Sequence, residues 1–372
     1  MFEEVKKYVD KMVSEKELPY VGVIVYKEHE ELYSYFNGRK APVGRDNLLT
    51  LYSCTKPVTV VSAMQLVEAG RLSLDDEVGR YIPAFYDAYT LDESNNKVPL
   101  KSPILIRHLF TMSAGIDYAS NKAPITEFIK NNPRATTAEV VSTFVKSPLH
   151  FEPGTRFMYS YCHDVLGAVI EVISGKTLAE YMKENIFIPL GMKNTSMEAM
   201  NYYEKPPVSY VWKDGYVDDG GEAFRRFILT ERYYSGGAGL VGTAEDYALF
   251  ADALASGGVG KNGNRIIGEE AIRQIGKVQI ENIDVQNSFT CVQGADYGYG
   301  LGVRVRTKPH ECGIPVGEFG WDGAAGTYLL ADRENKISIV IGLNILRWPE
   351  RVKGDHLAIA DRVYREVLKN GN

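Results

Sequence analysis

Strand-like segments lie at both ends of this chain, and a long helical pattern separates them. Residues 20–26 are β-branched and aromatic, and a charged turn connects them to residues 32–36, which precede an Asn-Gly pair. This pattern is typical of a β-hairpin. Strand patterns return near the end of the chain, at 300–305, 326–331 and 337–343. Both termini are therefore predicted to build one antiparallel sheet.

The middle of the chain is predicted to be mostly helical. Helical spacing appears at 104–112, 137–145 and 164–186, with loops rich in Pro, Gly and Asn between these segments. A first helix is expected over 1–17 and a last one over 355–369. The expected fold class is α+β, an α/β sandwich in which an antiparallel sheet from both termini is flanked by the terminal helices and carries a mostly helical inserted lobe.

This arrangement predicts two domains. Residues 1–58 and 236–372 would form the α/β sheet domain, and residues 59–235 would form the mostly helical inserted domain. With 372 residues, of which 45% are hydrophobic and 24% charged, the chain is long enough for a substantial core. The cleft between the two domains is the expected place for a functional site.

A serine and a lysine stand three residues apart where an apolar run gives way to a helical pattern. Positions i and i+3 of a helix share one face within roughly 5 to 6 Å at Cβ, so Lys56 can reach the Ser53 hydroxyl. A serine hydroxyl is a poor nucleophile unless a neighbouring base takes its proton. Backbone N–H groups at the helix start can receive the developing oxyanion. Without a second basic group, Ser53 would be interpreted as a helix N-cap.

The same spacing occurs a second time, in a different context. Ser94 and Lys97 lie within a polar stretch that predicts a surface loop. An almost continuous apolar run over 58–67 follows Lys56 and indicates a buried helix. Context therefore selects Ser53 as the candidate nucleophile.

Two further segments offer a proton carrier and a second oxyanion donor. Tyr159 has a phenol with an ordinary pKa of about 10, and a Lys56 ammonium held against it would favour the phenolate. The pair could take the Ser53 proton and hand it to the leaving group without a histidine. Residues 319–326 are a glycine-punctuated segment that leads into a strand, where the backbone N–H of Ala324 could complete an oxyanion hole. Taken alone, Tyr159 would pack like most tyrosines.

Together these segments resemble the serine β-lactamase and penicillin-binding-protein-like hydrolases, in the class C β-lactamase-related branch. The resemblance covers residues 21–343. It includes further motifs at 66–76, 107–115, 189–192 and 236–243. It implies Ser53 as the nucleophile and Lys56 and Tyr159 as the proton-handling pair. It also implies the backbone amides of Ser53 and Ala324 as the oxyanion hole.

Two motifs depart from those of the β-lactamases and peptidases of this family. Tyr161 stands where those proteins have Asn, and Trp321-Asp322-Gly323 stands where they have Lys or His before Thr/Ser-Gly. Asp322 would repel a penicillin-type carboxylate, and the Trp321 indole offers only one donor. Both segments are instead similar to those of the family VIII carboxylesterases, which implies neutral acyl esters as substrates.

The sequence thus predicts a serine hydrolase that acts through an acyl-enzyme, with carboxylesterase activity on small acyl esters as the preferred hypothesis. The candidate substrate-binding residues are Tyr161, Trp321, Asp322, Gly323 and Arg347. Arg347 could replace the missing cation, which keeps β-lactamase or D-amino-acid peptidase or amidase activity as an alternative, although a surface charge is the simpler interpretation. A catalytically silent binding or scaffold homologue is a third hypothesis, because two motifs are altered. The intact serine, lysine and tyrosine set argues against it.

Composition limits the partners and cofactors. The net charge of −6 and the lack of a Lys/Arg run argue against nucleic acid or an anionic membrane and favour a small-molecule substrate. The cysteines and histidines lack zinc-site spacing, so free thiols and no metal or cofactor are expected. The first segment is amphipathic and unlike a signal peptide, and no apolar run approaches the roughly 18 residues of a membrane helix. A cytoplasmic location is the expectation, unless the chain has been trimmed.

Overall fold

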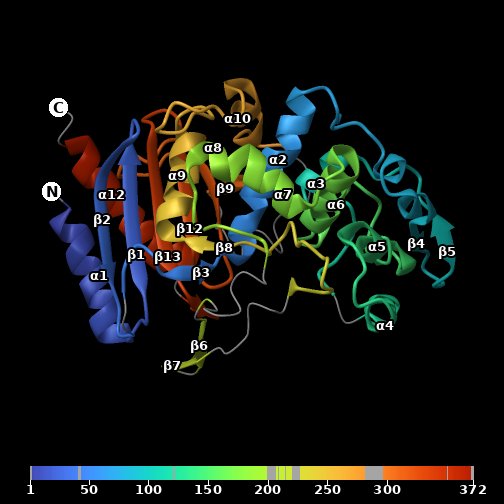
Figure 1. The fold of residues 1–372 in the computed structure, drawn as a ribbon, viewed down its shortest axis with the longest axis horizontal. Helices are drawn as coiled ribbons and strands as arrows, with labels where there is room; N and C mark the ends of the chain where they lie inside the picture. The colour runs from blue at the N-terminus through green and yellow to red at the C-terminus, as the bar shows by residue number, and fades with distance from the viewer. Residues whose placement is uncertain are drawn as a thin grey trace.

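Strands from both ends of the chain form one seven-stranded antiparallel sheet in the order β2-β1-β13-β12-β11-β10-β9 (Figure 1). The computed structural model describes residues 2–40, 43–119, 122–198, 207, 209–213, 215–219, 227–280, 296–349 and 351–369. The strands of the sheet are β1 (Val21–Lys27), β2 (Glu30–Asn37), β9 (Tyr297–Tyr299), β10 (Arg304–Arg306), β11 (Phe319–Asp322), β12 (Tyr328–Asp332) and β13 (Ile337–Leu343). In the register of β1 with β13, Val21 lies opposite Leu343. The prediction that both termini share one sheet is confirmed.

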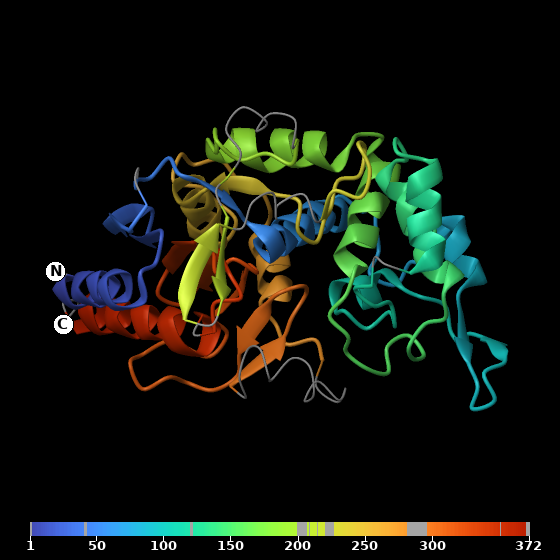
Figure 2. The same ribbon diagram turned by 90° about the horizontal axis from the view of Figure 1, so that it is seen from below.

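Helices cover both faces of this sheet. The terminal helices α1 (Glu3–Lys16) and α12 (Leu357–Lys369) lie side by side (Figure 2) and share a buried cluster with Val21, Val23 and Val25 of β1. The alternate residues Ile24 and Tyr26 join the cluster that contains α9 (Ala244–Ala255). Successive side chains of a strand point to opposite faces, so β1 is buried on both sides. The predicted α/β sandwich is confirmed.

Helix α2 (Thr55–Glu68) connects the sheet to the helical part of the chain. Nearly all of its residues are buried, and it contacts both β11 and α6 (Cys162–Ser174). In Figure 1 it lies between the sheet and the group formed by α3, α5 and α6. The other helices here are α3 (Ile106–Phe110), α4 (Ala123–Asn131), α5 (Thr137–Val141), α7 (Leu178–Met182) and α8 (Ile188–Leu190), and α10 (Glu269–Ile275) follows α9. The division into domains at residues 58 and 236 stays a prediction.

The predicted strand at 300–305 is confirmed only at its end, where β10 begins at Arg304, and is wrong for residues 300–303. The structure has a turn between β9 and β10 there, closed by a hydrogen bond of 2.8 Å from the Gly300 N–H to the Val303 carbonyl. Gly302 has a φ of 72°, which ends a regular strand. Three small sheets were also not predicted. They pair β3 (Leu48–Thr50) with β8 (Val241–Thr243), β4 (Tyr89–Leu91) with β5 (Lys97–Pro99), and β6 (Tyr210–Lys213) with β7 (Tyr216–Asp219) and β14 (Ile345–Leu346).

Two further predictions concern the cysteines and membrane-spanning helices. Cys54, Cys162 and Cys312 are free thiols, as predicted, whereas Cys291 lies outside the described residues. None of the helices in the described parts of the chain has the length and hydropathy needed to cross a bilayer.

Candidate active site

A strained turn presents Ser53 at the start of α2. Ser53 is the middle residue of the 3₁₀ helix Tyr52–Cys54, and Tyr52 before it has a φ of 44°, a value rarely adopted by a residue with a side chain. Cys54 fixes the other side of the turn. Its carbonyl accepts a hydrogen bond of 2.7 Å from the Tyr247 hydroxyl, and its Sγ lies 3.3 Å from the Thr327 carbonyl oxygen. The serine therefore lies between a strained residue and a cysteine that is fixed by two contacts.

The three side chains selected from the sequence meet at one oxygen. Lys56 Nζ lies 3.1 Å from Ser53 Oγ, and the Tyr159 hydroxyl lies 2.7 Å from the same Oγ. Lys56 is buried, whereas Ser53 and Tyr159 keep partial exposure. A substrate can therefore reach Oγ while the amine stays shielded from water.

Burial lowers the pKa of Lys56 from its ordinary value to about 7, because the charged amine loses its hydration. The negative charge of Asp164 opposes this shift. A second contact orients the amine, which donates a hydrogen bond of 2.8 Å to the Gly237 carbonyl. With its N–H directed to Gly237, a neutral amine keeps its lone pair for the Ser53 hydroxyl proton.

Tyr159 differs from the expectation of a phenolate. Desolvation raises the pKa of its phenol, and the hydrogen bonds with Ser53 and Trp321 offset this only in part. Lys56 Nζ lies over the face of the Tyr159 ring, 4.5 Å from the centroid. The two groups are therefore linked through Ser53 Oγ, and Tyr159 serves as a hydrogen-bond donor. The physical reason is that desolvation disfavours the charged forms of both groups.

The third motif packs against this group through its indole. Trp321 Nε1 donates a hydrogen bond of 3.3 Å to the Tyr159 hydroxyl, and the two rings are stacked with centroids 5.7 Å apart. Asp322 is buried, and its negative charge raises the pKa of Lys56 slightly against the effect of burial. A Cβ at Gly323 would collide with the Leu51 carbonyl oxygen, which explains why glycine stands there.

The other two substrate-binding candidates lie in different surroundings. Tyr161 is buried at the start of α6, where its ring packs 4.4 Å from that of Tyr118 and 4.9 Å from that of Phe144. Arg347 is exposed just after β14, and its charge acts on Lys213 of β6. The substrate-binding roles of these residues, and the oxyanion hole of Ser53 and Ala324, stay predictions.

Sequence reasoning missed three groups around the lysine. The ring of Tyr118 lies 5.5 Å from Lys56 Nζ and stacks on Tyr159. Asp164 accepts hydrogen bonds from the hydroxyls of Tyr233 and Ser235, at 2.8 and 2.6 Å. The Gly237 carbonyl is the third group. Asp164 and Gly237 belong to segments that the sequence singled out, but nothing in their local pattern indicates contact with a lysine.

Comparison with known proteins identifies the family. The family model described as Beta-lactamase matches residues 5–364. The chain belongs to the beta-lactamase family. The resemblance to β-lactamase-related proteins found in the sequence is therefore confirmed.

Individual relatives of the family include enzymes. Esterase EstB of Burkholderia gladioli is 27% identical over 369 residues, which cover 92% of this chain and 88% of the esterase. Protein Rv1367c of Mycobacterium tuberculosis is 29% identical over 312 residues, which cover 78% of this chain and 76% of that protein. A solved structure described as EstCE1, a hydrolase with promiscuous acyltransferase activity, has a TM-score of 0.79 and 25% identity and covers 97% of this chain and 98% of its own. Relatives of this kind support an enzymatic role within the family.

Proposed function

We propose that this protein is a serine hydrolase that forms an acyl-enzyme at Ser53, and that its substrates are small neutral carboxylic esters. One observation carries the proposal, the shielded Lys56 amine with a pKa lowered to about 7, lying 3.1 Å from Ser53 Oγ. A base with a pKa near the working pH is neutral often enough to accept a proton and still basic enough to remove it.

The hydrogen bonds at Ser53 Oγ provide a path for the proton of the Ser53 hydroxyl. In the resting state the Tyr159 hydroxyl and the Lys56 amine both donate to Ser53 Oγ, and another amine N–H donates to the Gly237 carbonyl. For the reaction the neutral amine turns its lone pair to the Ser53 hydroxyl, which then donates to it across the same 3.1 Å. As Oγ attacks the ester carbonyl, its proton moves to Lys56 and the carbonyl oxygen becomes an oxyanion. The backbone N–H groups of Ser53 and Ala324 are the proposed donors to that oxyanion.

The leaving group and the second half-reaction use the same groups. The Tyr159 phenol donates its proton to the departing alkoxide, and the Lys56 ammonium returns a proton to the phenol. The alcohol leaves, and the acyl group remains as an ester on Ser53. Water then attacks this ester and Lys56 accepts the water proton. Lys56 passes this proton to Ser53 Oγ as the carboxylic acid departs, which restores the neutral amine.

The third motif favours a neutral substrate over an anionic one. Where related β-lactamases are expected to have a cation, this chain has Trp321, whose indole N–H is used by Tyr159, and the buried carboxylate of Asp322. A substrate carboxylate brought close to Asp322 would be repelled. The esterase and hydrolase among the relatives are consistent with this choice.

A parallel assay tests the proposal. Wild-type protein is expected to hydrolyse p-nitrophenyl butyrate faster than nitrocefin or a D-alanyl peptide, and Ser53→Ala is expected to lose at least about 10³-fold in kcat. Ser94→Ala is the matched control, because Ser94 has the same Ser-x-x-Lys spacing on the exposed β4–β5 turn. It is expected to keep full activity.

Two outcomes would contradict parts of the proposal. Turnover of nitrocefin or the peptide without ester hydrolysis would replace the esterase assignment with the alternative activities. A fluorophosphonate probe that labels neither wild-type protein nor Ser94→Ala would favour the scaffold hypothesis, since an activated serine is expected to react.

A further inference from the structure

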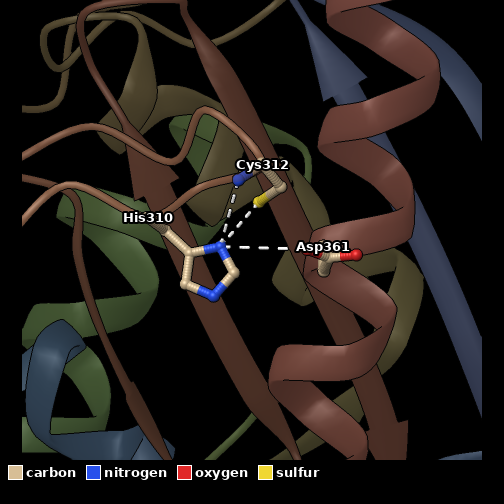
Figure 3. A group of neighbouring side chains, drawn as sticks. All are labelled: His310, Cys312 and Asp361. Carbon is tan, nitrogen blue, oxygen red and sulfur yellow. Dashed lines mark hydrogen bonds and ion pairs between the residues drawn. The ribbon is translucent and has the colours of Figure 1, made fainter.

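A histidine, a cysteine and an aspartate meet at a place that the proposed reaction does not use. His310 and Cys312 belong to the connection between β10 and β11, and Asp361 belongs to α12 (Figure 3). His310 Nδ1 lies 3.0 Å from Cys312 Sγ and 3.8 Å from Asp361 Oδ1. The three potential ligand atoms all lie within 4.8 Å of one another. The sequence did not indicate this group, because helix α12 brings Asp361 to the other two only in the folded chain.

The two separations from His310 Nδ1 lie near those expected around a tetrahedral metal ion. Zinc bonds of about 2.0 to 2.3 Å to nitrogen, oxygen and sulfur place neighbouring ligand atoms roughly 3.4 to 3.6 Å apart. The two distances from His310 Nδ1, 3.0 and 3.8 Å, lie on either side of that range. Imidazole, thiolate and carboxylate are all common zinc ligands, and the mixed nitrogen and sulfur set favours zinc over calcium or magnesium.

We propose that His310, Cys312 and Asp361 bind one zinc ion, with a water molecule as the fourth ligand. All three side chains have little exposure but are not sealed from solvent, with 21% for His310 and 20% for Asp361, so an ion can enter. The ion would connect the β10–β11 segment to α12.

The histidine is held in the form that a metal needs. The Cys312 backbone N–H points at His310 Nδ1 at 3.4 Å, and the Cys312 thiol lies on the same nitrogen. Nδ1 accepts this N–H with its lone pair, and a metal bound at Nδ1 would take the place of this long contact. The turn itself is fixed by backbone hydrogen bonds of 3.1 Å from His310 to Ile314 and 3.0 Å from Gly313 to His310.

The aspartate is oriented by a partner one turn along the same helix. Arg365 Nε donates to Asp361 Oδ2 at 2.8 Å, and another guanidinium nitrogen lies 3.1 Å from Oδ1. Such outer contacts fix the orientation of ligating carboxylates in metal sites. Glu311 also contacts Arg365, at 3.2 Å, so the charge of the arginine is shared.

Binding exchanges a proton for the metal. Only the thiolate form of a cysteine binds a metal, so the Cys312 thiol must give up its proton. The thiol proton passes to solvent as the sulfur–zinc bond forms, and no oxidation or reduction takes place. Thiolate and carboxylate together balance the charge of Zn²⁺.

Cobalt provides the first test, because Co²⁺ adopts the same ligands as zinc and a thiolate–cobalt bond gives a charge-transfer band in the near ultraviolet. Chelator-treated full-length protein is expected to bind one Co²⁺ per chain with this band, and added Zn²⁺ is expected to remove it. Cys312→Ser is expected to lose the band. His150→Ala is the matched control, since His150 also pairs with an aspartate, 2.8 Å from Asp117, but has no role in the proposed zinc site. It is expected to keep the band.

Thermal unfolding provides the second test. Excess Zn²⁺ is expected to raise the unfolding temperature of the wild type and of His150→Ala by a few degrees, and to leave Cys312→Ser unchanged. If Cys312→Ser does not fold, His310→Ala and Asp361→Asn are to be compared instead, each with zinc affinity at least about tenfold weaker than that of the wild type.

Cobalt binding without the band in the wild type, or a band that persists in Cys312→Ser, would overturn the proposal. These readouts do not depend on enzymatic activity, so they stand apart from the proposed hydrolase.

Discussion

At the scale of single residues, the lysine of the site gives the clearest pH dependence. Only neutral Lys56 can accept the Ser53 proton, and burial lowers its pKa to about 7. We therefore expect kcat/KM for p-nitrophenyl butyrate to rise about tenfold per pH unit below pH 7 and to level off above it. Lys56→Arg is expected to lose at least about 10³-fold at every pH, because a guanidinium stays protonated in proteins.

The second Ser-x-x-Lys segment supplies the control for this measurement. Lys97→Arg changes an exposed lysine near the β4–β5 turn and should leave the pH profile as it is in the wild type. A wild-type profile that is flat across neutral pH would show that Lys56 is not the group that takes the proton.

A milder change tests the contact between the third motif and the tyrosine. Trp321→Phe keeps an aromatic ring but removes the hydrogen bond of 3.3 Å from the indole N–H to the Tyr159 hydroxyl. One hydrogen bond of this type is worth about 1 kcal/mol, so kcat is expected to fall about fivefold. KM should stay nearly constant if the indole orients Tyr159. Trp212→Phe, on the small sheet with β14, is the matched control, and a larger effect on KM than on kcat would instead assign Trp321 to substrate binding.

Residue spacing explains which parts of the site could be predicted. Ser53 and Lys56 are neighbours on one helical turn, so their contact follows from local geometry. Tyr159 reaches them only because α6 packs against α2, which is a tertiary contact. Its selection therefore depended on the family resemblance. Neither the hydrogen bond of Lys56 with Gly237 nor its charge interaction with Asp164 had a local signal in the sequence.

At the scale of elements, long periodic segments were predicted and short ones were missed. β1 and β13 are apolar and β-branched over seven residues each, and their pattern is visible in the sequence. β3 and β14 have three and two residues. Each exists only because its partner supplies the hydrogen bonds, as β8 does for β3, and a partner nearly two hundred residues away cannot be inferred from local spacing.

The contact between β11 and the turn before α2 can be tested with one methyl group. Gly323→Ala would place a Cβ against the Leu51 carbonyl oxygen, and this backbone atom cannot move aside without moving the turn that holds Ser53. We expect a loss of about 2 to 4 kcal/mol in the free energy of unfolding, measured by urea denaturation, together with reduced kcat.

Gly263 serves as the control, because a Cβ there would have free space and alanine would bring only its other effects. Gly263 has a φ of 82° and free space where its Cβ would lie, so Gly263→Ala carries only the backbone strain of about 1 kcal/mol. Its kcat should match that of the wild type. If Gly323→Ala were as stable and active as Gly263→Ala, the proposed close contact between β11 and the turn would be contradicted.

At the scale of the whole molecule, the sheet separates two buried clusters with different tasks. The cluster that includes Cys54 and Trp321 surrounds the candidate active site, and the other joins α1 and α12 to the opposite face of the sheet. The second cluster is built from both ends of the chain. Strand β1, near the N-terminus, lies between β2 and β13, and β13 comes from the C-terminal part of the chain. Stability contributed by the terminal helices should therefore be separable from catalysis.

Tyr364 of α12 allows this separation to be measured. It is buried in the second cluster, and its hydroxyl donates a hydrogen bond of 2.7 Å to Asp332 Oδ2. Tyr364→Ala is expected to cost about 3 to 5 kcal/mol in the free energy of unfolding, and Tyr364→Phe about 1 to 2 kcal/mol, because the first removes the ring and the second only the hydroxyl. At temperatures where both variants remain folded, kcat and KM should equal those of the wild type. If kcat instead fell in step with the loss of stability across this pair, changes in the packing of α12 would be shown to affect Ser53 through the sheet. The stability contributed by the second cluster would then not be separable from catalysis.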